Sequence, residues 1–93
     1  MSIGPDTIII RNAEAIFAPI DDGLAVFDAE RGAYFDFNAI ARSIWDTLDA
    51  PITPTNLRDR LLDKYDVTRE QCLMEVMEFL DFLLEKGLVH VVD

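Results

Sequence analysis

Two side chains of this 93-residue chain could act alone as a nucleophile or as an acid–base group. His90 is the one histidine, and it stands in the apolar segment LVHVV. Cys72 is the one cysteine, and the acidic neighbours Glu70 and Glu75 would raise the pKa of its thiol and lower its reactivity. We therefore expect His90 to serve packing or to lie at the surface, and Cys72 to be structural or an exposed bystander.

The carboxylates are numerous but scattered. Five of them follow one predicted helix at spacings of three to five residues: Glu70, Glu75, Glu78, Asp81 and Glu85. This spacing fits a solvated helix face, or an acidic rim that meets a basic or hydroxyl-bearing partner. The sequence contains no phosphate-binding loop, no CxxC, no HExxH and no nucleophile elbow. We predict no catalysis, no metal site and no cofactor.

The balance of charge limits the partners that this chain can bind. The formal net charge is -10, from 18 acidic and 8 basic residues. Nucleic acids and anionic membranes bind clustered Lys and Arg, so both are disfavoured as partners. One cysteine cannot form an internal disulfide, no apolar run reaches membrane-spanning length, and the N-terminus lacks the features of a secretory signal. We expect a cytoplasmic protein with one domain.

The first half of the chain reads as short strands. Residues 8–10 are a run of isoleucine that could form a strand or a packing arm. Three further segments read as strands between turn-forming residues, which predicts a three-stranded antiparallel meander: 15–20, 24–28 and 33–37. We assign residues 1–13 to an N-terminal arm or short strand, and residues 14–93 to a single domain.

Three helices are predicted to follow this sheet. Their apolar residues recur at helical spacing over three segments: 39–48, 55–65 and 69–86. Asn38 can cap the first helix, Thr53 or Thr55 the second, and Thr68 the third, which Gly87 would end. The final LVHVV is strand-like. This order predicts an α+β fold that resembles a winged helix-turn-helix.

The third predicted helix carries more apolar side chains than one core-facing stripe needs. A broad face contains Leu73, Val76, Met77, Leu80, Leu83 and Leu84. Cys72, Phe79 and Phe82 extend along a flank, with Glu75 between them. A small domain could bury the whole set. Alternatively, the flank forms a groove for a partner, since exposed apolar patches mark binding sites.

Strand 33–37 raises the same question, because the last strand of a meander is an edge. An edge has unpaired N–H and C=O groups that invite another strand, and only Asp36 could discourage such pairing here. An edge beside an aromatic groove suits an extended peptide that adds as a strand. Tyr34 and Asp36 share one face, and Phe35 and Phe37 share the other. We expect Phe35 and Phe37 to lie mostly in the core, and the sequence leaves open which face meets the peptide.

Two motifs resemble the PqqD-like family over about residues 14–89. The first is G-x-Y-F-x-F-N followed by I-W-x-x-L, and the second is EVMEFLDFLLEKGLV. Phe37 stands where the family usually has Leu. The matching residues are Gly32, Tyr34, Phe35, Phe37, Asn38, Ile44, Trp45, Leu48, Val76, Phe79, Leu80, Leu83, Gly87 and Leu88.

The resemblance implies a non-catalytic peptide chaperone. Family members bind the leader segment of a ribosomally made precursor peptide as an extra strand against the third strand of the sheet, over the third helix. They deliver it to a leader peptidase or other modifying enzyme. Carried over by position, the implied contacts are Ala33, Tyr34, Phe35, Asp36, Phe37, Cys72, Glu75, Phe79 and Phe82.

Within the family, the free-standing form with a Tyr-Phe strand and an Ile-Trp helix is most similar to the lasso-peptide type. A separate leader peptidase is the usual partner of that type. The chaperone of pyrroloquinoline quinone synthesis, which serves a radical SAM enzyme, is the alternative.

Two other functional classes are compatible with the predicted order of strands and helices. A winged-helix DNA regulator is disfavoured, because the third helix has only acidic charges between Arg69 and Lys86. A dimerisation module would pair its open sheet edge with its own copy and form a homodimer.

Overall fold

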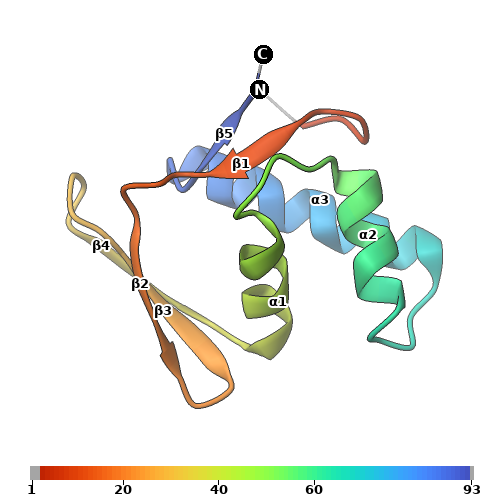
Figure 1. Cartoon of the computed structure of the whole chain (residues 1–93), viewed down its shortest axis with the longest axis horizontal. Coiled ribbons are helices and arrows are strands. Elements are labelled where there is room, and N and C mark those ends of the chain that lie inside the picture. The colour runs from red at the N-terminus through yellow and green to blue at the C-terminus, as the bar shows by residue number, and fades with distance from the viewer. Residues whose placement is uncertain (1–2, 93) are drawn as a thin grey trace.

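The computed structural model describes residues 3–92 and confirms the predicted α+β class. Figure 1 shows the sheet of β2, β3 and β4 on one side and the three helices on the other. The elements in chain order are β1 (Ile9–Arg11), β2 (Ile16–Ile20), β3 (Gly23–Asp28), β4 (Ala33–Phe37), α1 (Ala39–Thr47), α2 (Pro54–Leu62), α3 (Arg69–Glu85) and β5 (Val89–Val91).

Strands β2, β3 and β4 form the predicted antiparallel meander, in that spatial order. Val26 on β3 pairs with Phe17 on β2 and with Phe35 on β4, which sets the register of all three strands. Gly32 ends the turn between β3 and β4 with φ 66°, a conformation that costs little without a Cβ.

A second, two-stranded sheet joins the two ends of the described chain. β1 pairs antiparallel with β5, and Ile9 also forms a bridge with Ile52 before α2. Ile3 and Ile9 are buried in the same core as the helices. The Ile3 backbone N–H donates a hydrogen bond to Asp81 Oδ1 on α3, at 3.0 Å. Residues before β2 therefore contribute directly to the packing of the domain.

Side-chain caps begin each helix where the sequence predicts them. Asn38 Oδ1 accepts the Ala41 N–H at 2.9 Å, and Thr68 caps α3 in the same way. Of the two candidates for α2, Thr53 is the cap, and Pro54 follows it at the first helical position. Gly87, with φ 73°, follows the last turn of α3.

The sequence predicted that the second helix ends at about Tyr65, but α2 ends at Leu62. The N–H groups of Lys64 and Tyr65 both donate to the carbonyl of Leu61, which tightens the last turn.

The main core lies between the helices and one face of the three-stranded sheet. Trp45 of α1, Leu57 of α2 and Leu80 of α3 are fully buried there. Leu24 and Val26 fill it from β3. Burial of the inner face holds β4 against the helices, so that its free edge runs beside α3.

Candidate functional site

The hairpin of β2 and β3 determines which backbone groups of the sheet remain free. The turn of Asp21 and Asp22 makes Ile20 and Gly23 the hydrogen-bonded pair that closes this hairpin. Backbone groups alternate sides along a strand. Gly23 therefore bonds toward β2, and Leu24 bonds in the opposite direction, toward β4.

β4 is an edge strand within the described residues, because it pairs with β3 alone. Leu24 pairs with Phe37, so Phe37, Phe35 and Ala33 direct their backbone groups toward β3. The N–H and C=O groups of Tyr34 and Asp36 consequently point to the open edge. This edge offers a donor and an acceptor at each of two alternate residues.

The two faces of β4 have different environments. Phe37 is buried, as expected, whereas Phe35 is only half-buried. Tyr34 and Asp36 lie on the outer face, where the Tyr34 hydroxyl donates to Asp36 Oδ1 at 3.0 Å. This hydrogen bond, with smaller contributions from burial and from the Asp36 charge, raises the pKa of Tyr34. Tyr34 therefore stays neutral well above pH 7.

Aromatic rings connect the inner face of β4 to α3. The Phe35 and Phe82 rings meet edge to face at 5.7 Å between centroids, and those of Phe37 and Phe79 meet at 5.2 Å. Phe79 and Phe82 stack on each other at 6.3 Å. Phe82 keeps 37% of its surface exposed. The rings form an apolar floor beside the open edge.

A groove of about 480 Å³ lies over this floor. It opens to solvent between β4, the start of α1 and the C-terminal half of α3. We call it the β4–α3 groove, and its lining residues are Tyr34, Phe35, Asp36, Phe37, Asn38, Ala41, Phe79 and Phe82. The structure thus brings together most of the residues that the sequence assigned to the strand and to the helix flank.

A family model confirms the relationship that the sequence motifs indicated. The model described as "Coenzyme PQQ synthesis protein D (PqqD)" matches residues 23–89, from the start of β3 into β5. The chain belongs to the PqqD family. No curated protein sequence matches it.

Solved structures share the PqqD fold of this chain. "TbiB1 in Complex with the TbiA(beta) Leader Peptide" is 26% identical, with a TM-score of 0.80, and the match covers 87% of this chain and 94% of that one. "Lasso peptide synthetase B1 complexed with the leader peptide" is 23% identical, with a TM-score of 0.77 and coverage of 88% and 96%.

A third structure carries the family name itself. It is the solution NMR structure of the PqqD truncation of Methylobacterium extorquens PqqCD, a stand-alone recognition element of ribosomally synthesised and post-translationally modified peptides. It is 13% identical, with a TM-score of 0.79, and the match covers 96% of this chain and 95% of that one.

Cys72 is buried, with only 4% of its surface exposed, so the structure favours the structural role over the exposed one. Cys72 begins the buried stripe of α3 that continues through Val76, Leu80 and Leu83. The helical period contained this signal, because four-residue steps from Cys72 lead into the core. Cys72 lines a small apolar pocket of about 60 Å³ between the helices of this PqqD domain.

The environment of Cys72 also makes the thiol a poor nucleophile. Burial raises its pKa, and the charges of Glu75 and Asp59 raise it further, against an opposing effect of Arg58. Glu75 is exposed and borders the small pocket. Both residues lie on α3 beyond the β4–α3 groove, toward the N-terminus of the helix.

Asn38 and Ala41 line the β4–α3 groove, although the sequence did not assign them to the site. Asn38 caps α1 directly after β4, and Ala41 follows one turn later. Asn38 belongs to the family motif, so the sequence contained a signal that could have placed it at the site. The small side chain of Ala41 leaves room for a ligand where a larger residue would fill the groove.

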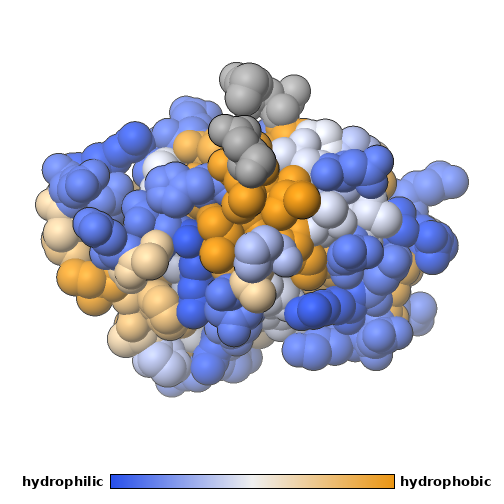
Figure 2. All heavy atoms as spheres, turned by 45° about the horizontal axis from the view of Figure 1, so that its top comes forward, coloured by the Kyte–Doolittle hydropathy of each residue, from blue (hydrophilic) through white to orange (hydrophobic). Residues whose placement is uncertain are grey.

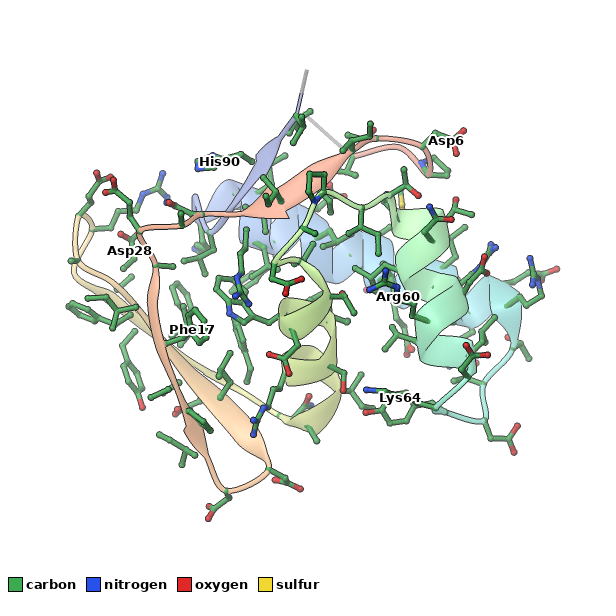
Figure 3. All side chains as sticks on the ribbon, in the orientation of Figure 1. Asp6, Phe17, Asp28, Arg60, Lys64 and His90 are labelled. Carbon is green, nitrogen blue, oxygen red and sulfur yellow. The ribbon has the colours of Figure 1, made fainter. Side chains whose placement is uncertain are left out.

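The remaining candidates do not form a second site. His90 lies exposed on β5 (Figure 3). Among residues 3–92, no three His, Cys, Asp or Glu side chains gather in a way that could hold a metal ion. None of the helices in that range is both long enough and apolar enough to cross a membrane.

Proposed function

We propose that this protein is a non-catalytic chaperone that binds the leader segment of a ribosomally synthesised precursor peptide. The leader adds as a strand to the open edge of β4 and packs over α3. The observation that carries this proposal is the free edge of β4 beside the aromatic floor of Phe79 and Phe82. The similarity to TbiB1, which is bound to a leader peptide, supports the same function.

Backbone hydrogen bonds supply the register of the bound peptide. The outward N–H and C=O groups of Tyr34 and Asp36 pair with alternate residues of the incoming strand. Each hydrogen bond contributes about 0.5–1.5 kcal/mol net, because it replaces one to water. These bonds do not distinguish one sequence from another, so selectivity has to come from side chains.

Side-chain selectivity arises in the β4–α3 groove. Every second side chain of an added strand points toward α3, where it covers Phe35, Phe79 and Phe82. An apolar residue at that position is favoured, since it buries surface at about 25 cal/mol per Å². Asp36 lines the groove and Glu75 lies one turn before Phe79 on α3, and these exposed carboxylates favour basic residues in the rest of the peptide. The preferred leader is thus extended, with apolar anchors and basic flanks.

We further propose that the loaded protein presents the precursor to a leader peptidase or another modifying enzyme in the cytoplasm. Similarity to a TbiB1 structure and a lasso peptide synthetase B1 structure favours lasso-peptide biosynthesis. The match to the PqqD family model keeps a pyrroloquinoline quinone-type pathway as the second candidate.

An NMR titration of the labelled protein with the leader encoded beside its gene tests the binding proposal. Saturable shifts are expected in residues 33–37 and at Phe79 and Phe82, with small changes on β1, β5 and α2. A scrambled leader of equal composition is the control. Absence of saturation at high peptide concentration, or shifts confined to another face, would contradict the proposal.

A size measurement separates the chaperone from the rival dimerisation module. The chaperone is expected to remain a monomer at concentrations where it binds one leader peptide. Light scattering coupled to size exclusion, with and without the peptide, gives both values. A dimer that persists with saturating peptide and excludes it would favour pairing of the open edge with a second copy.

A further inference from the structure

The three-stranded sheet has a second apolar surface, on the face that the helices do not cover. Ile16, Phe27 and Tyr34 stand directly opposite one another across β2, β3 and β4. They are 59%, 39% and 58% exposed, and Ile20 is exposed at the end of the same face. We call these four residues the outer-face patch. Orange and pale orange atoms gather at the left of Figure 2, where Figure 1 places this sheet.

The outer-face patch points away from the core of the domain. Phe17, which alternates with Ile16 along β2, points to the inner face and contacts Trp45 at 5.7 Å between rings (Figure 3). Phe35 likewise points inward to Phe82. The outer-face patch therefore exposes large apolar side chains that the core of the domain does not use.

The charges near the patch are mainly negative. In residues 12–41 the acidic residues are Glu14, Asp21, Asp22, Asp28, Glu30 and Asp36, and the only basic residue is Arg31. The Arg31 guanidinium lies 3.8 Å from the Asp28 carboxylate and donates to the Glu85 carbonyl of α3 at 3.1 Å. Arg42 of α1 donates to the Gly23 carbonyl at 3.3 Å, beside the turn of Asp21 and Asp22. The carboxylates still outnumber these two basic groups. The rim of the patch is thus acidic, which fits a partner with an apolar surface flanked by Lys and Arg.

The same charges disfavour a second copy of this chain as the occupant. A two-fold contact through the outer-face patch would place the acidic turn of Asp21 and Asp22 against the acidic rim of its copy. Each chain also carries a net charge of -10. Like charges that face each other across an interface cost several kcal/mol.

The outer-face patch is continuous with the proposed peptide site. Tyr34 and Asp36 lie on the outer face and also border the β4–α3 groove. A peptide strand added to β4 would widen the sheet, and its alternate side chains would stand beside Tyr34 and Asp36 on the outer face. Binding of the leader would therefore enlarge the outer surface with side chains that the free protein lacks.

We propose that the outer-face patch, widened by the bound leader, is the docking surface for the enzyme that acts on the precursor. This inference rests on the proposed function and adds the place and the chemistry of the enzyme contact. The enzyme surface that fits is apolar in the centre and basic at the rim. Since the enzyme contacts both components, the leader raises the affinity of the enzyme for this protein, and the enzyme raises the affinity of the leader by the same factor.

The test uses the purified leader peptidase or modifying enzyme encoded beside this protein's gene, and the full chain loaded with its leader. The double variant Ile16→Thr/Phe27→Thr keeps β-forming residues and removes the apolar surface. We expect its affinity for the enzyme to fall at least about tenfold and its affinity for the leader to stay within about twofold. Ile8→Thr, at an exposed isoleucine outside the outer-face patch, is the matched control.

A second variant tests the charge component without altering packing. Asp21→Asn/Asp22→Asn neutralises two carboxylates in the turn beside the patch, and it should weaken the enzyme complex mainly through a slower association rate. The wild-type complex should weaken as salt rises from about 50 mM to about 500 mM, and the neutralised variant should respond less.

The possible results separate this inference from the proposed function. Unchanged enzyme affinity in Ile16→Thr/Phe27→Thr, with leader binding intact, would overturn the docking surface alone. Equal enzyme affinity with and without leader would overturn the widened surface. A wild-type dimer that the double variant loses would assign the patch to a second copy. Failure of the wild-type protein to bind the leader would overturn the proposed function, and this inference with it.

Discussion

Phe79 and Phe82 line the same groove but serve the fold to different degrees. Phe79 is half-buried and packs against Phe37, which is part of the core. Phe82 is more exposed and contacts Phe35 at the border of the groove. A change at Phe82 should therefore report peptide binding with little loss of stability, whereas a change at Phe79 should affect both.

Phe82→Glu should weaken leader binding about tenfold or more, which corresponds to about 1.4 kcal/mol. The substitution replaces the apolar floor with a charge, and a bound peptide would have to desolvate that charge. The free energy of unfolding should change by less than about 1 kcal/mol. Fluorescence anisotropy with a labelled leader and denaturant unfolding measure the two effects.

The matched control for this prediction is Met74→Glu, at an exposed position of the same helix outside the β4–α3 groove. It should leave the affinity for the leader unchanged. Equal affinity of Phe82→Glu and the wild-type protein would contradict the placement of the groove. Unfolding of Phe82→Glu would show that Phe82 supports the core.

The buried thiol of Cys72 predicts a specific dependence on pH. Its pKa is raised in the folded protein, so its contribution to stability is complete below the ordinary thiol pKa and is lost as pH rises through the folded pKa. As the pH rises, the thiol of the unfolded state ionises before that of the folded state, and this ionisation lowers the free energy of unfolding. Denaturant midpoints between about pH 7 and about pH 9.5 should fall more for the wild-type protein than for Cys72→Ala.

The same variant examines the peptide contact implied for Cys72. Since the thiol lies in the core stripe of α3, Cys72→Ala should bind the leader with unchanged affinity. A thiol reagent should react with the native protein far more slowly than with the unfolded chain. A clear loss of leader affinity in Cys72→Ala would place a peptide side chain in the small pocket between the helices.

At the scale of elements, the transition from β4 to α1 combines a free edge with a capped helix. Asn38 ends the strand and caps the helix within one residue. The strand pairs with β3 through the backbone of alternate residues and leaves the others free. Changes to the backbone and changes to the cap can therefore be tested separately.

Asp36→Pro should abolish most leader binding while the sheet stays folded. Proline removes the outward N–H of residue 36, which does not bond to β3, and proline is tolerated at edge strands when that group faces solvent. Asp36→Asn keeps the backbone donor and is the control for loss of the carboxylate. Circular dichroism monitors the fold, and the leader affinity of the proline variant should fall well below that of the asparagine variant.

Asn38→Ala should destabilise the protein by about 1 kcal/mol, because the Ala41 N–H loses its side-chain acceptor at the start of α1. Asn38→Asp retains an acceptor and should cost less. The shift of the denaturant midpoint at constant slope measures both values. If the Asn38→Ala and Asn38→Asp variants are equally stable, the side-chain cap does not hold the end of β4 in place.

At the scale of the whole molecule, contacts between distant parts of the chain hold the domain together. β1 pairs with β5 across almost the full length of the chain, and Ile9 packs in the same core as α3. Neither short strand would be stable alone. The residues before β2 should therefore behave as part of the cooperative unit.

Ile9→Ala should destabilise the whole domain by about 2–5 kcal/mol, since it leaves a cavity at a fully buried side chain. Ile8→Ala, at the exposed neighbour, should be close to neutral. Thermal and denaturant unfolding should show one shifted transition. A two-step transition would instead show that the N-terminal residues unfold separately, as an independent arm would.

The sequence by itself determined most elements of this protein and predicted much of its candidate site. Strand alternation, helical period and the capping residues Asn38, Thr68 and Gly87 act within a few neighbouring residues, so they can be read locally. The order of the strands followed from short turns, and it identified residues 33–37 as an open edge. The paired motifs at Gly32–Leu48 and Val76–Leu88 were sufficient to indicate the family.

Only the tertiary structure decided which surfaces these elements share. In the structure Phe35 contacts Phe82, and Cys72 lies in the core. β1 pairs with β5, and Ile16 and Phe27 are exposed on the outer face of the sheet. The helical period defines a stripe on α3, but the packing of α1, α2 and the sheet decides how much of that stripe is covered. Contacts between residues far apart in the chain depend on this mutual packing, which no local pattern contains.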